Sequence, residues 1–291
     1  MTDVSIVILT YKEAPAVLTA CLKSLTRPGQ ASSGTSLVRD EIIVVDNAGN
    51  AATEKLVKEY LTDATYRSNE MNRGFAAAVN QGMKLATGRY VLLLNPDTVV
   101  PPDAIAKMVA HMDRDTEVGI GSCIIRYPNG ELQDSIRRFP KLIDQLLIML
   151  KVPHFVRRVR SIDDYMMRDV DPLQTQDVDS IMGAFMMIRR SVIDAIGLFD
   201  ERYFIWFEEV DYCKMAHDAG FITRHYADVE IVHHKGHTFD QLATIRKQKW
   251  VRESMRKYFA KHHGVGAALV LWILAPVFIV LAYGAAVIKR G

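Results

Sequence analysis

A short apolar run that ends on an acidic residue constrains the fold of this chain more than any other feature. The stretch from Gly88 to Val100 reads GRYVLLLNPDTVV, so large apolar residues lie between a glycine and Asn95-Pro96-Asp97. Such a run, bounded by a glycine and a proline, predicts a strand that is covered on both faces in the centre of a sheet. Asp97 is then expected at the carboxyl end of that strand.

Strands and helices are predicted to alternate on either side of this run. Apolar runs predict strands and 3.6-residue spacing predicts helices. Strands are expected at 4–10, 41–45, 66–68 and 119–126, and helices at 12–25, 53–61, 74–86 and 101–112. This alternation predicts an α/β fold with a parallel sheet and right-handed crossovers. The strand at 41–45 ends on Asp46-Asn47, so a second acid is expected at a strand's carboxyl end.

The carboxyl ends of strands in open α/β sheets are the usual place for ligands. Asp97 has no neighbour in sequence that could neutralise it, so it could bind a hard divalent cation that carries a diphosphate. The alternative is a polar turn after Pro96. The first strand is not followed by GxGxxG, and the chain has no Walker A sequence, which argues against a dinucleotide-binding dehydrogenase. A bound nucleotide would be held by acids and a cation.

Acidic residues gather again at 199–211, which reads FDERYFIWFEEVD and precedes a helix expected over 212–219. The carboxylates of Glu208, Glu209 and Asp211 follow four aromatic residues. They could simply form a charge cluster that favours a helix N-terminus. Alternatively, one of them, crowded by apolar surface and like charge, has a raised proton affinity and acts as a general base.

Three histidines lie within 230–238, which reads EIVHHKGHT. Neutral imidazole is a common metal ligand, so a histidine and an aspartate on separate strand ends could hold one cation. Between the apolar run at 88–100 and the acidic stretch at 199–211, residues 179–189 are predicted to form one strand, with the methionines in the core. The basic stretch 137–160 is expected to be either an amphipathic helix or a cationic lip over an anionic acceptor.

The chain has 291 residues, of which 49% are hydrophobic, enough for one large domain or two small ones. Cys21, Cys123 and Cys213 have no paired spacing, so buried reduced thiols are expected. The N-terminus has no pattern of a secretory signal. Residues 246–263 carry seven Lys or Arg against one Glu, next to an otherwise acidic body. This asymmetry predicts a partner for the tail, either nucleic acid or an anionic membrane.

Residues 264–288 contain no charge. As a helix, these 25 residues would be roughly 37 Å long, and a bilayer core is about 30 Å thick. A membrane helix is therefore predicted, although Pro276 would kink it and leaves an in-plane arrangement open. A buried core helix is the remaining alternative. Because a hydrophobic span follows the basic arm directly, nucleic acid is the less favoured partner.

Seven motifs in order resemble a known family: VSIVILTYK, IIVVDNAG, NRGFAAAVNQG, ATGRYVLLLNPDT, GAFMMIRR, FDERYFIWFEEVDYC and IVHHKGHT. Together they are similar to family 2 glycosyltransferases of the GT-A fold, in particular the rhamnosyltransferase-like branch. The likeness covers about residues 3–240. It implies a mostly parallel central sheet flanked by helices in a catalytic domain over 1–245. A basic linker helix over 246–263 and a hydrophobic anchor over 264–291 would follow.

The resemblance also implies a metal site. The LNPD motif would be the counterpart of the family's DxD, so Asp97 would bind Mg²⁺ or Mn²⁺, and Asn95 replaces the first acid. His233 corresponds to the family's late metal-binding histidine, and His234 is the alternative. In the catalytic pair Glu208-Glu209, Glu209 is the expected base, with Asp211 as the second choice.

The remaining site residues follow from the same resemblance. Asp46 would contact the base and ribose of a sugar nucleotide. The residues expected around the nucleotide sugar are Thr10, Tyr11, Asp46, Asn47, Arg73, Gly74, Phe75, Asn95 and Asp97. Trp206, Arg137 and Arg138 are the expected acceptor contacts.

The implied activity is a metal-dependent, inverting transfer of a sugar, with L-rhamnose from dTDP-rhamnose favoured. The acceptor would be a polyprenyl-diphosphate-linked glycan or a polysaccharide at the cell surface. The catalytic domain would lie on the cytoplasmic side of the inner or plasma membrane, and a homo-oligomer is an open alternative to a monomer. A different class of function is a catalytically silent, membrane-bound subunit that binds sugar nucleotide. Nucleotidyl transfer is disfavoured because the chain lacks a glycine-rich basic loop near its N-terminus.

Overall fold

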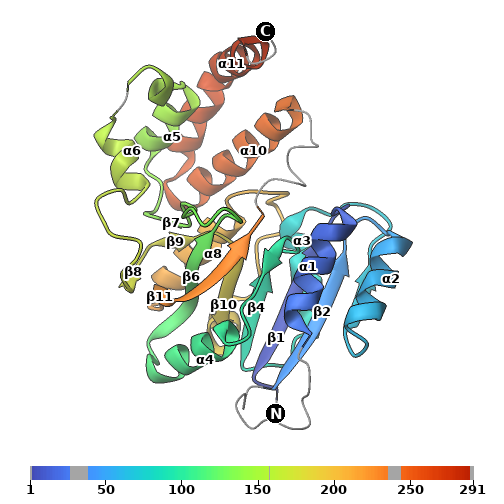
Figure 1. The fold of residues 1–291 in the computed structure, drawn as a ribbon. Coiled ribbons are helices and arrows are strands. Elements are labelled where there is room, and N and C mark those ends of the chain that lie inside the picture. The colour runs from blue at the N-terminus through green and yellow to red at the C-terminus, as the bar shows by residue number, and fades with distance from the viewer. Residues whose placement is uncertain (1, 27–38, 157, 235–243, 289–291) are drawn as a thin grey trace.

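The fold is built around one large mixed sheet (Figure 1). The computed structural model describes residues 2–26, 39–156, 158–234 and 244–288. Among these residues the sheet has the strand order β3-β2-β1-β4-β10-β6-β11-β5, with β8 paired to β11. The strands are β1 (Val4–Thr10), β2 (Asp40–Asp46), β3 (Thr65–Ser68), β4 (Tyr90–Leu94), β5 (Thr98–Val99), β6 (Val118–Arg126), β8 (Gln176–Asp177), β10 (Phe185–Arg189) and β11 (Ile222–His233).

The predicted central strand is confirmed as β4, which is buried along its whole length. It pairs in parallel with β1 and antiparallel with β10, in a register that sets Leu94 opposite Phe185. Strand β10 therefore starts at the edge of the sheet where β1, β2 and β4 end. The residues that follow β4 and those that precede β10 share this edge.

Helices cover both faces of the sheet, because the strand side chains alternate between two apolar layers. Ile6 and Ile8 pack in one layer and Val7 in the other. The first layer holds α1 (Pro15–Leu25), α2 (Ala51–Tyr60) and α4 (Ala104–Arg114). The second holds α3 (Phe75–Leu85), α7 (Arg190–Ile196) and α8 (Glu208–Asp218). Cys21, Cys123 and Cys213 are free and buried, as predicted.

Two predicted elements are broken in the structure. The stretch 137–160 is not one helix but β7 (Ile136–Arg137), α5 (Leu142–Met149), the 3₁₀ turn η1 (Val152–His154) and the start of α6 (Arg160–Tyr165). Pro140 and Pro153 explain these breaks, since proline cannot donate to a continuing helix. The strand expected at 179–189 is divided into β9 (Ser180–Ile181) and β10 by a turn at Gly183. Strand β9 pairs with β7 outside the main sheet.

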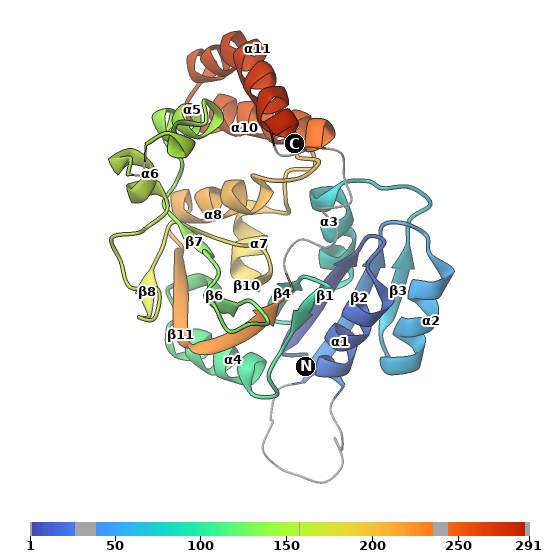
Figure 2. The same ribbon diagram turned by 45° about the horizontal axis from the view of Figure 1, so that its top comes forward.

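The C-terminal part is a helical hairpin of α10 (Thr244–His262) and α11 (Val265–Ile288), which lies beside α5 at one end of the molecule (Figures 1 and 2). Gly264, with φ +85°, makes the turn between the helices. Their core includes Tyr258, Phe259, Leu271 and Phe278. Within the described ranges, no helix combines the length and apolar character needed to cross a membrane. The spanning anchor predicted for 264–291 is therefore not supported.

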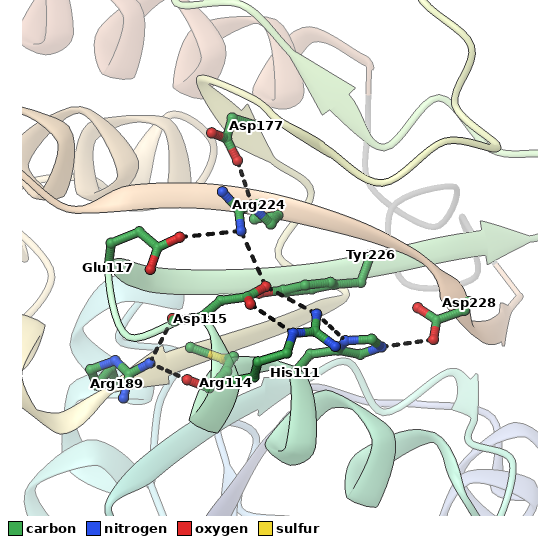
Figure 3. A network of polar contacts seen from close by, with 10 residues as sticks. His111, Arg114, Asp115, Glu117, Asp177, Arg189, Arg224, Tyr226 and Asp228 are labelled. Carbon is green, nitrogen blue, oxygen red and sulfur yellow. Dashed lines mark hydrogen bonds and ion pairs between the residues drawn. The ribbon is translucent and has the colours of Figure 1, made fainter.

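A polar network joins the start of β11 to β6 and α4 (Figure 3). Arg224 contacts Asp115, Glu117 and Asp177, and Tyr226 donates to Asp115. This network lies at the opposite end of β11 from His233. It fixes the long strand that carries the histidine.

Candidate functional site

Asp97 and His233 lie side by side at the carboxyl edge of the sheet. Strand β5 pairs with β11 so that Thr98 is opposite His233, and the backbone N–H of His234 donates to the Asp97 carbonyl at 2.8 Å. This register places His233 Nε2 3.2 Å from Asp97 Oδ1. Both residues are nearly enclosed, with exposed fractions of 8% for Asp97 and 4% for His233. The side chain of His233, rather than that of His234, is the one beside Asp97.

The donor set at this point fits a divalent cation. A carboxylate oxygen and an imidazole nitrogen face each other at 3.2 Å, and Asn95 Nδ2 lies 3.3 Å from the same nitrogen. Carboxylate suits Mg²⁺ and Mn²⁺, and imidazole is a common ligand of transition metals. In the part of the chain that the structure describes, no three His, Cys, Asp or Glu residues form a complete metal-binding group. A cation here would take its other ligands from diphosphate oxygens and water.

Glu208 and Glu209 open helix α8 at a strained corner. Trp206 and Phe207, which precede them, have positive φ values of 63° and 69°. Residues other than glycine rarely adopt this conformation, and it is enriched where a protein positions functional groups. The corner directs Glu209 into a cavity of about 290 Å³. Among the described residues, Oε2 of Glu208 and Oε2 of Glu209 are buried without a hydrogen-bond partner.

Burial raises the pKa of the Glu209 carboxyl above its ordinary value. The pKa of Glu208 is raised strongly, first by burial and second by the charge of Glu209. A carboxylate with raised proton affinity that faces a cavity can take a proton from a hydroxyl group near neutral pH. Glu209 has this arrangement, whereas Glu208 is enclosed.

The turn that divides β9 from β10 joins the two parts of the site. The Ala184 carbonyl accepts from the Asn95 N–H at 3.1 Å. Its neighbour Gly183 faces Glu209, whose Cβ is 4.0 Å from the position that a Cβ on Gly183 would take. The loop that carries Asp97 and the helix that carries Glu209 are therefore packed on two consecutive residues.

The cavity is also lined by two of the three predicted acceptor residues, Trp206 and Arg137, and by Tyr165 and Asp134. The Arg137 side chain donates to the Ile136 carbonyl at 2.6 Å, and burial lowers the pKa of its guanidinium. Arg138 does not line the cavity. It forms a bidentate ion pair with Asp169, with distances of 2.7 and 2.8 Å.

Asp211 lies elsewhere, in the contact between α8 and α10. It is 1% exposed and accepts from Lys261 Nζ at 2.7 Å, His262 Nε2 at 2.7 Å and the Tyr203 hydroxyl at 3.2 Å. Because both of its oxygens face the C-terminal hairpin and Tyr203, the structure does not bring Asp211 to the cavity. This placement favours Glu209 over Asp211 as a base.

The predicted nucleotide-sugar residues surround the ends of β1 and β2. Asp46 is buried and accepts from the Ala48 and Asn50 N–H groups and from the Tyr66 hydroxyl. Thr10 Oγ1 lies 3.5 Å from Asp46, and Tyr11 follows Thr10 at the end of β1. Asp46 thus shapes the loop after β2, and its contact with a base or ribose stays a prediction.

Asn47 connects that loop to the start of α3. Its amide contacts Asn69, Asn72 and the Gly74 carbonyl, and its oxygen accepts from the Arg73 N–H at 3.0 Å. Gly74 has φ +85°, and a Cβ there would lie 2.7 Å from the Phe204 carbonyl. The same carbonyl accepts from the Phe75 N–H at 2.7 Å. The Arg73 side chain is exposed.

Two functional features were not found by sequence reasoning. Gln133 contacts His233 at 2.9 Å, but a single glutamine in a polar stretch has no signature. Gly183 could have been found, since a glycine inside a strand pattern often marks a bulge or a close approach. The third histidine of the predicted cluster, His237, lies outside the described residues.

Comparison with known proteins identifies the family of this chain. Residues 5–197 match the family described as glycosyl transferase family 2. This chain belongs to glycosyl transferase family 2. Two similar curated proteins are an N-acetylglucosaminyl-diphospho-decaprenol L-rhamnosyltransferase of Mycobacterium tuberculosis and the rhamnosyltransferase WbbL of Escherichia coli. The Mycobacterium tuberculosis protein is 26% identical, and the match covers 82% of this chain and 78% of the relative. The Escherichia coli protein is 23% identical, and the match covers 76% of this chain and 82% of the relative.

Similarity to solved structures shows that this chain has a GT-A-like α/β fold. A mannosyltransferase from Pyrobaculum calidifontis, in complex with GDP-Man and Mn²⁺, has a TM-score of 0.57 and 18% identity, over all of this chain and 78% of its own. GalNAc-T7, solved with UDP, GalNAc and Mn²⁺, has a TM-score of 0.58 and 15% identity. That match covers 89% of this chain and about half, 51%, of GalNAc-T7. These similarities support the fold.

Proposed function

We propose that this family 2 glycosyltransferase is a cation-dependent, inverting enzyme that moves L-rhamnose from dTDP-rhamnose to a lipid-linked glycan during synthesis of a cell-surface polysaccharide. The observation that carries the proposal is the packing of the Asp97 loop and the Glu209 helix on Gly183-Ala184. Through these two residues, the loop of the proposed cation ligand Asp97 and the helix of the proposed base Glu209 contact the same turn. Both curated relatives described above are named rhamnosyltransferases, which favours rhamnose as the sugar.

Glu209 acts on the acceptor in this mechanism. Its carboxylate accepts the proton of an acceptor hydroxyl in the cavity, and the hydroxyl oxygen attacks the anomeric carbon of the donor. The bond from that carbon to the diphosphate oxygen breaks on the opposite face, and the nucleoside diphosphate leaves with the electron pair. A single displacement inverts the anomeric centre.

Asp97 and His233 would hold the divalent cation, Mg²⁺ or Mn²⁺, which neutralises the charge of the diphosphate leaving group. Asn95 lies beside them, with its amide nitrogen 3.3 Å from His233 Nε2. Thr10, Tyr11, Asn47 and Arg73 would form the nucleotide side, around the loop that Asp46 fixes. The buried hydrogen bonds of Asn47 keep this side preorganised.

The acceptor would bind in the cavity beside Glu209. The guanidinium of Arg137 is largely buried. Among the described residues, no carboxylate lies within ion-pair distance of it. A buried guanidinium of this kind is suited to a phosphate or diphosphate group. Tyr165 and Trp206 complete a lining that accepts a sugar ring. The Mycobacterium tuberculosis relative is named for a diphospho-decaprenol acceptor, which fits a lipid-linked substrate.

We also propose that the hairpin of α10 and α11 rests on the surface of the inner or plasma membrane, with the catalytic domain in the cytoplasm. Helix α11 packs through Leu271 and Phe278, while Trp272 is 60% exposed and Leu269, Ile273 and Val280 are also exposed. Helix α10 beside it is rich in Lys and Arg. An uncharged apolar face next to a basic helix matches an anionic lipid surface.

The proposal is tested with the purified chain, a set of nucleotide sugars and an N-acetylglucosaminyl-diphosphate lipid. Transfer is measured with and without EDTA, and the anomeric configuration of the product by NMR. We expect transfer from dTDP-rhamnose, with inversion, that EDTA abolishes and Mn²⁺ or Mg²⁺ restores. No transfer from any donor, together with an unchanged cellular role of the Asp97→Ala variant, would instead favour the silent subunit.

A further inference from the structure

Gln133 lies directly behind His233 in the segment between β6 and β7. It is 5% exposed, and its backbone N–H donates to the Ile125 carbonyl at 2.8 Å. Its side chain reaches the imidazole of His233 from the side away from Asp97. This contact is one of four that fix the glutamine against β6 and β11.

The orientation of the Gln133 amide is set by its partners. Its Nε2 lies 2.6 Å from the His233 carbonyl and 3.3 Å from the Arg126 carbonyl. Carbonyl oxygens only accept, so the NH₂ group must occupy this position. The amide oxygen Oε1 is then the atom that lies 2.9 Å from His233 Nδ1. An amide oxygen also only accepts, so Nδ1 must carry the hydrogen.

A neutral imidazole with its hydrogen on Nδ1 has a lone pair on Nε2. That nitrogen is the one 3.2 Å from Asp97 Oδ1. The Asn95 amide nitrogen, 3.3 Å from the same Nε2, can donate to this lone pair. Nε2 and the Asp97 oxygen are still two acceptors at 3.2 Å, and they repel each other unless a proton on Nε2 or a cation bound to both lies between them. We propose that Gln133 is a positioning residue, which holds His233 with the Nε2 lone pair directed to the cation site. This inference rests on the cation-dependent function proposed above.

A glutamine side chain can hold the imidazole of His233 in this orientation, whereas a carboxylate could not. Gln133 donates to the main chain of His233 and accepts from its side chain at the same time, so it fixes the place and the rotation of the imidazole. A glutamate would turn an oxygen toward two carbonyl oxygens. Groups of this kind behind a ligand histidine typically raise metal affinity 10–100-fold.

The first test measures the hydrogen directly and needs neither sugar nor metal. The chain is labelled with ¹⁵N-histidine and studied by NMR at a pH where the ring is neutral, with the His233 signals assigned by their loss in His233→Asn. We expect the hydrogen on Nδ1 in the wild type. A hydrogen on Nε2 would overturn the inference, whatever the enzyme transfers.

The second test measures free Mn²⁺ by electron paramagnetic resonance in titrations with dTDP present. Gln133→Leu should weaken Mn²⁺ binding by about 10–100-fold. Gln145→Leu is the matched control, because Gln145 is 4% exposed in α5 and should leave the affinity unchanged. Equal affinity in Gln133→Leu and the wild type would overturn the inference. If the wild type binds no Mn²⁺ but keeps the Nδ1 hydrogen, the cation-dependent function fails and the positioning of His233 stands.

Discussion

Two adjacent carboxylates have different surroundings at the start of α8. Glu208 is enclosed by protein, whereas Glu209 lines the cavity. Successive residues of a helix point about 100° apart, so one step along the chain separates a side chain in the core from one in the site. Only Glu209 lines the cavity in which we propose that the acceptor binds. Substitutions at the two positions should therefore have opposite consequences for activity and stability.

Glu209→Gln should lower kcat by about 10²–10⁴-fold, because an amide cannot take up the proton of the acceptor. Donor binding should change little, since Glu209 faces the acceptor cavity. Transfer assays and calorimetric titration of the nucleotide sugar measure the two quantities. Glu208→Gln is the neighbouring control and should keep most of the activity. A Glu209→Gln variant as active as the wild type would remove Glu209 from the mechanism.

The pH dependence of the reaction should reflect the burial of Glu209. Burial raises the pKa of this carboxyl, and the base acts only when it is deprotonated. The acid limb of the kcat/KM profile should therefore lie above the ordinary glutamate value of about 4.3, with activity lost as pH falls through it. A rate profile from pH 4 to 9 checks this. A limb at the ordinary value would show that the base is well solvated in the working enzyme.

Glu208→Gln should stabilise the fold at neutral pH. Burial raises the pKa of Glu208 in the folded state, so the folded protein favours the protonated carboxyl. That preference costs nothing below the unfolded pKa, and stability is lost progressively as pH rises from the unfolded pKa through the folded pKa. A Tm higher than that of the wild type by about 2–4 °C at pH 7.5 corresponds to about 1 kcal/mol in a domain of 150–250 residues. The difference should vanish near pH 4, and a constant difference would contradict the explanation.

At the scale of elements, Asp211 joins α8, the helix that carries the proposed base, to the basic helix α10. Its two oxygens are shared by Lys261, His262 and Tyr203. The acidic start of α8 therefore contains a structural carboxylate, Asp211, as well as the proposed base, Glu209. The hairpin is held by this polar contact and by the apolar core around Tyr258 and Phe259.

Asp211→Ala should destabilise the protein by about 1–3 kcal/mol, because it removes the acceptor that Lys261, His262 and the buried Tyr203 hydroxyl share. Urea unfolding measures the loss, and limited proteolysis shows whether α10 is released. The matched control is Asp218→Ala on the same helix, which breaks an exposed pair with Lys214 and should cost about 0–1 kcal/mol. Equal effects of the two substitutions would mean that Asp211 does not hold α10.

Charged residues and exposed apolar residues are distributed unevenly over the whole molecule. The sheet and its helices carry the candidate site, and the hairpin of α10 and α11 lies at one end of the molecule (Figure 2). Helix α11 has exposed apolar residues, and α10 beside it is rich in Lys and Arg. This arrangement would bring the enzyme to the surface where a lipid-linked acceptor lies.

The protein should therefore sediment with phosphatidylglycerol vesicles and much less with phosphatidylcholine vesicles. The double variant Trp272→Ser/Ile273→Ser should weaken the affinity for the vesicles at least tenfold, since each large apolar side chain buried in lipid contributes up to about 1.5–3 kcal/mol. The control pair Leu85→Ser/Leu173→Ser changes exposed apolar residues elsewhere and should bind as the wild type does. A wild type that stays in the supernatant with anionic vesicles would contradict the proposed docking.

The sequence by itself determined the framework of the protein. The covered strand that became β4, the alternation of elements before it and the acids at strand ends were all predictable, because burial and period are local properties of a chain. The family motifs gave the candidate residues Asp97, Glu209 and His233. The break at Gly183 was missed because the apolar residues on either side of the glycine also fit one continuous strand, although a glycine inside a strand pattern can mark a break.

Only the tertiary structure decided which of these residues meet. The pairing of β5 with β11 placed His233 rather than His234 beside Asp97, and the position of α10 enclosed Asp211. Gln133 came to lie behind the histidine although 100 residues separate them. Such contacts depend on strand registers and on turns between elements, whose geometry is fixed by packing across the whole fold. A local pattern carries no information about them.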